Sequence, residues 1–383
     1  MKVFLRQVIA RRKRAKSNFT RKHRPTRLTA HVKSMTTSVN ITTESNGGTD
    51  ARQIVSARAA ENLTTEAAVC CLCESDDAEV AGAGEDFEYR TCPDEFSAVR
   101  CRCCGLVYLN PRPALSELAR IYPASYHAFE FSEKEFGFVY QVRRKLEAKR
   151  LLSWCKNLPE RAHIVDIGCG DGFHLELLRD FGKKNWTLEG VDADERAAWM
   201  AEKKGLKVYC GTLETLDLPR KSYDLAFLIQ TVEHIADPPQ LLRRVLSILK
   251  PGGRLVIVTD NTDSLDFRLF KKRHWGGYHF PRHWNLFNPA TMRKLAAKTG
   301  FEVEKLTTQV SPVNWVYSVR NALADRNAPD WLVERFSLKS TVSLGVFTVF
   351  DYLHNLAGRG ALLNAIFKRP FDENDEAEIR PIK

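Results

Sequence analysis

One short stretch of this chain, residues 164–172, constrains its fold more than any other. The apolar run Ile164-Val165-Asp166-Ile167 leads into glycines at positions 168, 170 and 172, and a helical pattern begins at Phe173. Twenty residues further on, Gly190-Val191-Asp192 has the pattern of a second strand that ends in an acid. Glycines after a strand let the backbone approach a ligand, and an acid at the end of the next strand accepts hydrogen bonds from ribose hydroxyls. The pattern predicts an α/β sheet that binds a nucleoside-bearing cofactor.

The spacing of the glycines disfavours a dinucleotide. The G-x-G-x-x-G fingerprint needs its third glycine where this chain has Phe173, and here Gly172 comes one residue early. Asp166 precedes the loop, and a carboxylate there suits a cationic ligand better than a pyrophosphate. On these residues the chain resembles the class I S-adenosylmethionine (SAM)-dependent methyltransferases, whose first motif reads D-x-G-x-G-x-G. The resemblance implies an α/β fold: a Rossmann-like sheet with helices on both faces and SAM as the cofactor.

Apolar periodicity from residue 162 onwards alternates between strand and helix, which is typical of a mostly parallel sheet. The predicted strands are 162–167, 187–192, 206–210, 223–229, 254–259 and 301–308. The predicted helices are 173–182, 194–204, 239–249 and 289–299, with residues 250–253 as a turn and Asn288-Pro289 as a helix start. Beyond them, 315–323 and 342–356 are expected to be helical and 364–368 to be a last antiparallel strand.

Cysteines cluster ahead of this region. Seven of the ten cysteines lie between residues 70 and 104. No secretory signal is recognisable, so a reduced, cytoplasmic location and metal binding are favoured over disulfides. Two residues between thiolates let both sulfurs face one tetrahedral ion, and four thiolates leave no open position, so we predict structural Zn²⁺ on Cys70, Cys73, Cys101 and Cys104. Residues 76–88 are expected to form a hairpin tip within the 27-residue gap between the pairs, and the alternative is a set of buried free thiols.

The residues after the second cysteine pair extend the resemblance. The stretch Gly105-Leu106-Val107-Tyr108-Leu109-Asn110-Pro111-Arg112-Pro113 is similar to the end of the cysteine ribbon in methyltransferases of the ubiquinone-biosynthesis-like group. In that group a helical linker and a SAM domain follow the ribbon. The organisation expected here is a disordered basic and polar tail (1–66), a zinc-ribbon-like module (67–113), a helical linker (114–160), a SAM-binding domain (161–310) and a C-terminal helical insertion with the last strand (311–383).

The resemblance also assigns cofactor-binding residues. Asp166 and the loop Gly168-Cys169-Gly170-Asp171-Gly172 are expected at the methionyl end of SAM, and Asp192 at the ribose hydroxyls. Leu213, within Thr212–Glu214, is expected beside the adenine, and Gln230 completes the pocket. The alternative for each is an ordinary turn residue or a solvated acid.

Three histidines are candidates for the general base that a hydroxyl acceptor needs. Glu233-His234 resembles the L-E-H-x motif of ubiquinone-type O-methyltransferases, but adjacent side chains on a helix point about 100° apart, so the two are not expected to act as one dyad. The aromatic segment 261–288 is expected to be a lid and acceptor pocket hinged at Gly276-Gly277. It carries His279 and His283, and His283 is favoured because it matches a recurring P-x-H position. The alternatives are a structural histidine and a packed surface loop.

The charge of +11 belongs to one segment. Residues 1–34 hold twelve Lys and Arg and no acid, so the remainder of the chain is close to neutral at −1. This segment can be a nucleic-acid-binding arm, a transit-like segment or an upstream extension before a true start at Met35, which we favour. The apolar run 344–350 is too short to span a membrane, so a peripheral membrane contact is a minor possibility.

The function that the resemblance implies is SAM-dependent methyl transfer to a small-molecule acceptor, on a hydroxyl oxygen of a sugar, quinone-like, lipid-linked or secondary-metabolite compound. The alternative is an rRNA or tRNA methyltransferase, or an RNA-binding protein that uses the basic tail and the ribbon. An Asn/Asp-Pro-Pro-aromatic motif does not follow residues 223–229, which disfavours methylation of nucleic-acid amines. A non-catalytic partner with the same fold is a third possibility.

Overall fold

The structure is a computed structural model that describes residues 61–123, 126 and 133–371. The predicted basic tail therefore lies outside the described residues except for its last six positions. Of these, Thr65–Glu66 form strand β1, which pairs with β5 at Arg112–Pro113, so ordered structure begins before the predicted boundary at residue 67. Within the described residues no helix is both long and apolar enough to cross a bilayer.

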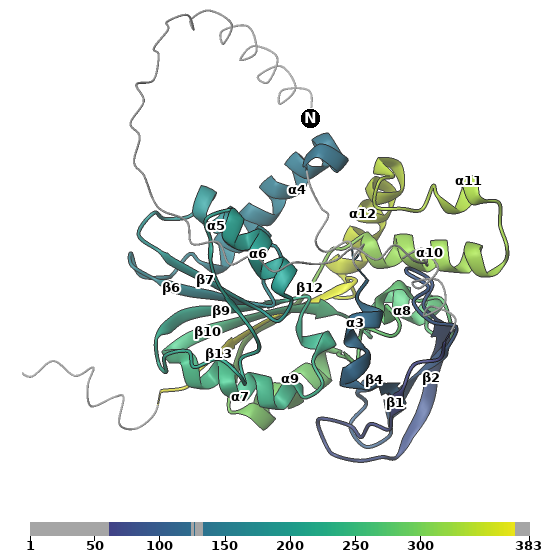
Figure 1. Cartoon of the computed structure of the whole chain (residues 1–383), viewed down its shortest axis with the longest axis horizontal. Helices are drawn as coiled ribbons and strands as arrows, with labels where there is room; N and C mark the ends of the chain where they lie inside the picture. Colours follow the sequence, from purple (N-terminus) through teal and green to yellow (C-terminus); the bar gives the residue numbers. More distant parts are fainter. Residues whose placement is uncertain (1–60, 124–125, 127–132, 372–383) are drawn as a thin grey trace, which may run out of the picture. The chain divides into compact units, whose positions relative to one another are not determined.

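A seven-stranded sheet forms the centre of the larger part of the molecule (Figure 1). Its strand order is β12-β13-β10-β9-β6-β7-β8, with β13 antiparallel to both of its neighbours and parallel pairing from β10 to β8. The strands are β6 (His163–Ile167), β7 (Thr187–Asp192), β8 (Lys207–Cys210), β9 (Tyr223–Ile229), β10 (Leu249–Asp260), β12 (Glu302–Gln309) and β13 (Leu362–Lys368). The α/β architecture predicted from the sequence is confirmed.

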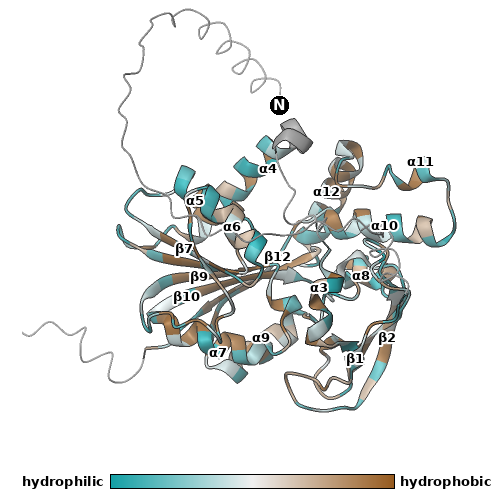
Figure 2. Cartoon of the chain, viewed as in Figure 1, coloured by the Kyte–Doolittle hydropathy of each residue, from teal (hydrophilic) through white to brown (hydrophobic). Residues whose placement is uncertain are grey.

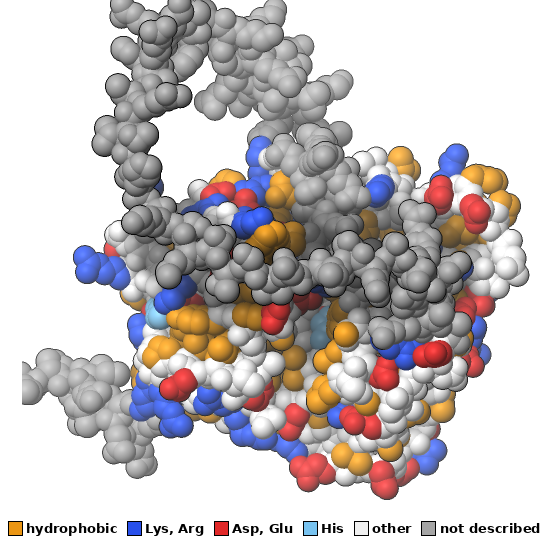
Figure 3. All heavy atoms as spheres, viewed as in Figure 1, with side chains coloured by type: hydrophobic (Ala, Val, Ile, Leu, Met, Phe, Trp, Pro, Cys, Tyr) orange, Lys and Arg blue, Asp and Glu red, His pale blue; other side chains and the backbone are white. Residues whose placement is uncertain are grey.

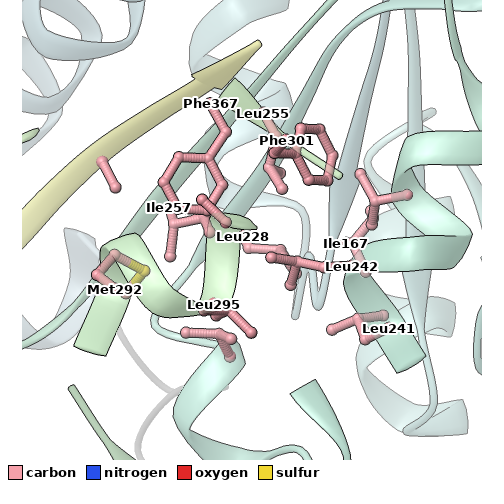
Figure 4. Packing of buried hydrophobic residues seen from close by; sticks show 14 of the residues in the cluster. Ile167, Leu228, Leu241, Leu242, Leu255, Ile257, Met292, Leu295, Phe301 and Phe367 are labelled. Carbon is pink, nitrogen blue, oxygen red and sulfur yellow. The ribbon is translucent and has the colours of Figure 1, made fainter. Parts of the chain in front are cut away.

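Helices cover both faces of this sheet. One face carries α7 (Pro238–Ile248) and α9 (Pro289–Thr299), and the other carries α4 (Glu133–Trp154) and α5 (Phe173–Phe181). Helix α6 (Glu195–Lys203) packs against β7 and β8. Figure 4 shows the first layer, in which Leu241 and Leu242 of α7 and Met292 and Leu295 of α9 share one cluster with Ile167 and Ile257 of the sheet. The helix starts follow from their caps: Asp194, Asp237 and Asn288 each accept a backbone N–H of the first turn.

One predicted turn is part of a strand. Residues 250–253, expected to separate a helix from a strand, lie inside β10, and the pairing with β9 shifts register between Leu249 and Arg254. The turn residues are therefore accommodated as an irregularity in a long strand rather than as a break. The start at Asn288 and the stop at Gly300, which has a positive φ of 82°, are as predicted.

A second, four-stranded sheet has the order β11-β4-β3-β2. Strands β2 (Ala78–Glu85), β3 (Glu95–Cys101) and β4 (Val107–Leu109) come from the cysteine module, whereas β11 (Asn285–Leu286) comes from the aromatic segment. The predicted hairpin tip at 76–88 is therefore mostly strand β2, and the connection between β2 and β3 is residues 86–94. The short helices η1 (Leu115–Glu117) and α3 (Leu118–Ile121) follow the module.

The helical insertion lies between β12 and β13. It comprises α10 (Val313–Asp325), α11 (Asp330–Val333) and α12 (Thr341–Leu356). Helix α10 contacts η4 (Gly276–Tyr278) and α8 (Leu265–Phe270) of the aromatic segment, so the insertion packs on the side that carries the candidate acceptor residues. Helix α12 is largely apolar in Figure 2 and leaves Val342, Val346 and Val349 more than half exposed.

Candidate functional site

The glycine loop follows β6 and has the backbone that its sequence requires. Gly168, Gly170 and Gly172 have positive φ values of 74°, 54° and 78°, a region that residues with a Cβ rarely adopt. The backbone N–H of Gly170 donates to Oδ2 of Asp192 at 2.7 Å, which joins the loop to the end of β7. The loop and the predicted ribose acid are therefore adjacent, as the sequence pattern required.

Asp166 is a buried carboxylate without a matching donor. Its side chain is 1% exposed, and neither oxygen has a hydrogen-bond partner within the described residues. The imidazole of His174 lies close by, with Nδ1 3.5 Å from Oδ2. Because a buried charge without a partner costs free energy, this position fits a cationic ligand group. A Cβ built on Gly170 would meet nothing within 4 Å, so the loop leaves space beside it. Both observations fit the SAM that the resemblance implies.

The other predicted cofactor residues differ in how they are placed. Cys169 points into the protein, with its Sγ close to Gly190, so only its backbone belongs to the loop. Leu213 is buried in the main core, whereas Thr212 and Glu214 are exposed. Gln230 has an unusual positive φ of 53° and donates from Nε2 to Oε1 of Glu233 at 2.8 Å.

Three histidines gather at the neighbouring strand ends. The ring of His283 lies 4.6 Å from that of His234 and 4.9 Å from that of His279, centroid to centroid. His234 belongs to η3 (Val232–His234) after β9, and the other two belong to the aromatic segment. We call His234, His279 and His283 the histidine cluster. All three predicted base candidates are therefore in one place.

Thr231 connects the glycine loop to the turn that carries His234. A Cβ on Gly168 would lie 2.6 Å from the side chain of Thr231, and the Thr231 hydroxyl donates to the carbonyl oxygen of Ile167 at 3.2 Å. Thr231 immediately precedes η3, which carries Glu233 and His234. The cofactor loop and the imidazoles therefore share one edge of the sheet, at the carboxyl ends of β6 and β9, where open α/β sheets bind ligands.

His283 is oriented by two oxygens. Its Nδ1 lies 2.9 Å from the carbonyl oxygen of Gly277 and 3.2 Å from Oδ2 of Asp260, which ends β10. Since a carbonyl oxygen only accepts, Nδ1 carries the proton and Nε2 has the lone pair. Burial acts to lower the pKa of His283, but the hydrogen bond and charge of Asp260 outweigh burial and raise it.

The other two imidazoles have different partners. Nδ1 of His234 lies 3.1 Å from the carbonyl oxygen of Arg282 and 2.9 Å from Oη of Tyr122. Burial, with the charges of the two other histidines, holds the pKa of His234 well below its usual value. His279 has its Nδ1 3.0 Å from Oε1 of Glu88, and its backbone has a positive φ of 40°. Strained residues of this kind cluster at functional sites.

Aromatic side chains from the module and the linker surround the cluster. Tyr89 lies between β2 and β3, and its ring centroid is 5.5 Å from that of Tyr126 and 6.0 Å from that of His279. Tyr122 meets Tyr126 edge to face at 5.1 Å. Three tyrosines from two segments thus form an aromatic wall beside the imidazoles.

A buried ion pair fixes the aromatic segment to the module. The Arg282 guanidinium is fully buried, donates to both carboxylate oxygens of Asp86 at 3.1 and 2.9 Å, and lies 4.5 Å from the ring of Tyr89. Its Nε donates to the carbonyl oxygen of Ile121 at 2.6 Å. One side chain therefore connects the module, the linker and the segment that carries His279 and His283.

The predicted hinge glycines are packed tightly. A Cβ on Gly276 would lie 2.7 Å from the carbonyl oxygen of Asn314 in α10, and one on Gly277 would lie 2.4 Å from the ring of Trp275. Neither glycine has a positive φ. The structure shows that these glycines permit close packing, and the hinge stays a prediction. Most large aromatic side chains of the segment are buried with the module: Trp275, Tyr278, Phe280 and Trp284.

The cysteine set predicted from the spacing is brought together. The sulfurs of Cys70, Cys73, Cys101 and Cys104 lie within 4.8 Å of one another, and the Cys70–Cys104 and Cys73–Cys101 sulfur distances are 3.3 and 3.4 Å. Tetrahedral zinc with Zn–S bonds of about 2.3 Å separates its sulfurs by about 3.8 Å, so the arrangement is compatible with the ion. The sulfur of Cys71 faces Asn285, and Cys103 is exposed. Neither of these two cysteines therefore belongs to the set of four.

Several site residues were not identified from the sequence. Glu88 and Tyr89 occupy a connection in a module predicted only to bind metal, and Asp260 ends a strand without a recognisable motif. Tyr122 and Tyr126 lie in the predicted linker, which was not assigned to the site. The Tyr-Pro-x-x-Tyr spacing was a possible signal for the last two, whereas the contacts of Glu88 and Asp260 depend on the tertiary fold.

Comparison with known proteins identifies a methyltransferase domain in this chain. A family model described as a methyltransferase domain matches residues 138–306. A ubiquinone biosynthesis O-methyltransferase of Cereibacter sphaeroides is 30% identical over 172 residues, which are 42% of this chain and 68% of that enzyme. An enzyme of the same name from Bradyrhizobium sp. is 32% identical over 109 residues, 28% of this chain and 43% of the relative. The chain thus spans from less than half to about two thirds of these relatives' lengths.

Solved structures that match part of this chain include a SAM-dependent methyltransferase of Thermotoga maritima, described as a possible histamine N-methyltransferase. It has 23% identity and a TM-score of 0.41, and the match covers 63% of this chain and 98% of that one. A geranyl diphosphate C-methyltransferase of Streptomyces coelicolor has 15% identity and a TM-score of 0.42, with 63% and 86% coverage.

Proposed function

Because the chain belongs to the class I SAM-dependent methyltransferases, we propose that it methylates a hydroxyl oxygen of a small, quinone-like aromatic acceptor. The observation that carries the proposal is the adjacency of two features at one sheet edge. One is the buried Asp166 beside the glycine loop, whose oxygens have no hydrogen-bond partner among the described residues, and the other is the histidine cluster, joined to the loop through Thr231.

Different residues are expected to bind the cofactor and the acceptor. SAM supplies an electrophilic methyl group on a sulfonium. Asp166 offers a negative charge to the cationic end of the cofactor, and Asp192, whose pKa burial raises, holds the loop through Gly170 and faces the ribose side. The tyrosine wall offers flat apolar surface to an aromatic ring. Imidazoles of the histidine cluster take the proton of the acceptor hydroxyl, with His283 the first candidate.

The relatives' names support oxygen as the methylated atom. Several of those that match with 30–32% identity are named O-methyltransferases of ubiquinone biosynthesis. We favour a small molecule over nucleic acid because Figure 3 shows acidic and basic side chains interspersed on the face in view. The described residues do include an arginine-lined groove by α7, formed by Arg220, Arg243 and Arg244, so RNA affinity against salt concentration is the control measurement.

The cofactor part is tested by calorimetric titration with SAM. The wild type is expected to bind, and Asp192→Ala is expected to lose at least about 10–100-fold in affinity, the equivalent of one charged hydrogen bond. Asp194→Ala is the matched control, since this neighbouring acid caps α6 and does not contact the loop. Unchanged binding in Asp192→Ala would remove the support for this pocket.

The acceptor part is tested with labelled SAM and a panel of acceptors. Catechol and 3,4-dihydroxybenzoate represent phenols, methyl glucoside represents sugars, and a short RNA represents nucleic acid. Label transfer to the phenols is expected. Transfer only to the sugar or the RNA would contradict the proposed acceptor class while leaving the methyltransferase assignment in place.

We further propose that Cys70, Cys73, Cys101 and Cys104 hold a structural Zn²⁺. Lys294 and Lys298 of α9 donate to the carbonyl oxygens of Cys104 and Leu72, so the same turns contact the SAM domain. Cys73→Ser is expected to lose zinc and to destabilise the module, whereas the exposed Cys103→Ser is expected to retain one zinc per chain by elemental analysis. Equal zinc content in both variants would contradict this site.

A further inference from the structure

A groove lined by arginines lies along α7, and none of its lining residues belongs to the glycine loop or the histidine cluster. It has a volume of about 460 Å³. The described residues that line it are Glu214, Arg220, Gln240, Arg243, Arg244 and Ser247. Three of the six are positively charged and one is negatively charged, so the groove fits an anionic occupant. We call it the arginine groove.

The guanidiniums of the arginine groove keep their charge available to an occupant. Arg244 donates from Nε to the carbonyl oxygen of Leu213 and from Nη2 to that of Leu216, both at 3.2 Å. These carbonyl oxygens orient the side chain without neutralising it. Arg220 and Arg243 are exposed, and no ion pair with a described acid is recorded for any of the three arginines. Because a guanidinium binds a carboxylate or a phosphate through two parallel hydrogen bonds, the groove suits groups of this kind.

The chain itself supplies a carboxylate-rich segment that begins at the same helix. Residues 372–378 hold two aspartates, three glutamates and no base. They lie outside the described residues, but the point where they begin is described. The guanidinium of Arg369 donates to the carbonyl oxygen of Leu249 at 2.6 Å, directly after α7, and the ring of Phe371 lies against Gly252. The acidic segment therefore begins at the C-terminal end of the helix that forms one wall of the arginine groove.

The segment is long enough to reach the groove. The α7 residues that line the arginine groove span 240–247, which is about 10 Å along the helix at 1.5 Å per residue. Seven extended residues reach up to about 25 Å. A short tether also gives the segment an effective concentration in the mM range, so weak individual ion pairs suffice for occupancy. An acidic segment of another molecule would have to compete with it.

We propose that residues 372–378 bind in the arginine groove of their own chain and exclude other anions from it. Arg220 and Arg243 are the exposed partners of the carboxylates, and Arg244 adds its charge from a fixed position. The inference goes beyond the proposed function, since it holds for any methyl acceptor. It also accounts for an arginine-lined groove in a chain whose acceptor is expected to be a small molecule.

Competition by a peptide tests the proposal in the full chain. A fluorescent peptide of residues 371–379 is the probe, and its anisotropy is measured at an ionic strength of about 0.15 M, which screens long-range attraction. The peptide is expected to bind the amide variant at least about 10-fold more tightly than the wild type, whose own segment occupies the groove. In the amide variant each of the five acids is replaced by its amide: Asp372→Asn, Glu373→Gln, Asp375→Asn, Glu376→Gln and Glu378→Gln.

Arginine substitutions added to the amide variant show where the peptide binds. Arg220→Gln with Arg243→Gln is expected to weaken peptide binding by about 10-fold or more, since both positions lose charged hydrogen bonds. Arg293→Gln with Arg326→Gln is the matched control, because these exposed arginines lie outside the groove and each donates to a backbone carbonyl oxygen four residues earlier. The control changes the net charge equally and should leave peptide affinity unchanged.

Three results would overturn the inference. The first is a wild type that binds the peptide as tightly as the amide variant does, because its groove would then be open to other anions. The second is equal peptide affinity in the groove and control variants, which would place the peptide on other positive charge, such as residues 1–34. The third is an amide variant that binds a short RNA but not the peptide, which would assign the groove to nucleic acid. If the groove variant fails to fold, shown by circular dichroism, Arg243→Gln alone replaces it in the same comparison.

Discussion

The cofactor side and the acceptor side of the site are built in different ways. On the cofactor side, Asp166, the three loop glycines and Asp192 lie within 27 consecutive residues, and backbone geometry defines the loop. On the acceptor side, the cysteine module, the linker, η3 and the aromatic segment each contribute side chains. There the Arg282–Asp86 pair joins residues 196 positions apart.

The two sides also differ in whether their buried charged side chains have hydrogen-bond partners. Asp166 is buried without a hydrogen-bond partner in the described residues, whereas Arg282 has Asp86, Ile121 and Phe280 as acceptors. A buried carboxylate without a hydrogen-bond donor beside a glycine loop indicates a position kept for a ligand. A fully partnered charge indicates a structural connection. The cofactor side is therefore expected to be sensitive in ligand affinity and the acceptor side in stability, and three predictions test this contrast.

The largest effect is expected from breaking the buried pair. Arg282→Met leaves the Asp86 carboxylate buried without a cation, which is expected to lower the free energy of unfolding by about 3–5 kcal/mol. The double variant Asp86→Leu/Arg282→Met removes both charges and should be less destabilised than the single variant. Urea denaturation measures both, and SAM affinity should stay within about twofold of the wild type in folded samples. Equal destabilisation in the single and double variants would contradict the role of the pair.

Substitutions at two loop glycines should distinguish a loss of stability caused by poor packing from a loss of SAM affinity. At Gly172, with φ 78°, a Cβ would lie 2.4 Å from Cδ1 of Leu206, so Gly172→Ala combines left-handed strain with overpacking and should cost about 2–4 kcal/mol. At Gly170, with φ 54°, a Cβ meets nothing within 4 Å, so Gly170→Ala should cost only about 1–2 kcal/mol.

The order of the two variants in SAM affinity should differ from their order in stability. The methyl group of Gly170→Ala projects into open space next to the loop, where the ligand is expected. This variant should therefore lose more SAM affinity than Gly172→Ala for the same loss of stability. Thermal denaturation and calorimetry on the same samples provide both quantities. If Gly170→Ala binds SAM as the wild type does, the space beside Gly170 is not part of the pocket.

The same contrast explains what could be predicted from the sequence. The glycine loop, the strand that ends at Asp192 and the capped helix after Asn288 follow from local rules of backbone and capping, and the predicted bounds are close to those observed. The cysteine set also came from local spacing. The hairpin tip at 76–88 and the turn at 250–253 were wrong because strand pairing with β3 and β9 outweighed the local turn signals.

The acceptor side could be predicted only in part. The three histidines were identified as candidates. The partners that contact their Nδ1 atoms are Glu88, Asp260 and the carbonyl oxygens of Gly277 and Arg282, and these contacts depend on the tertiary structure. The hinge at Gly276-Gly277 was inferred from the flexibility of glycine. In the structure these glycines pack closely against α10 and Trp275, and the hinge stays a prediction.

The smallest effect is expected at a partly exposed pair on the rim of the acceptor side. Asp325 of α10 accepts from His274 Nε2 at 2.9 Å and Arg273 Nε at 3.3 Å. The hydrogen bond from His274 and the charge of Arg273 lower the pKa of Asp325 below its value in the unfolded chain. The carboxylate therefore stabilises the fold above the unfolded pKa of about 3.9, and this contribution is lost as pH falls through the folded pKa.

Asp325→Asn should reduce the free energy of unfolding by about 0.5–1 kcal/mol at pH 7, the range of a partly exposed ion pair. The difference from the wild type should shrink as pH approaches 3, because the wild-type carboxyl then becomes protonated as well. Denaturant titrations at the two pH values measure it, with Asp330→Asn on the neighbouring α11 as the control. A difference that is unchanged between pH 7 and 3 would show that the amide alters packing instead. Asp325 and its two partners would then act as a structural connection, like the buried Arg282–Asp86 pair, although they are partly exposed.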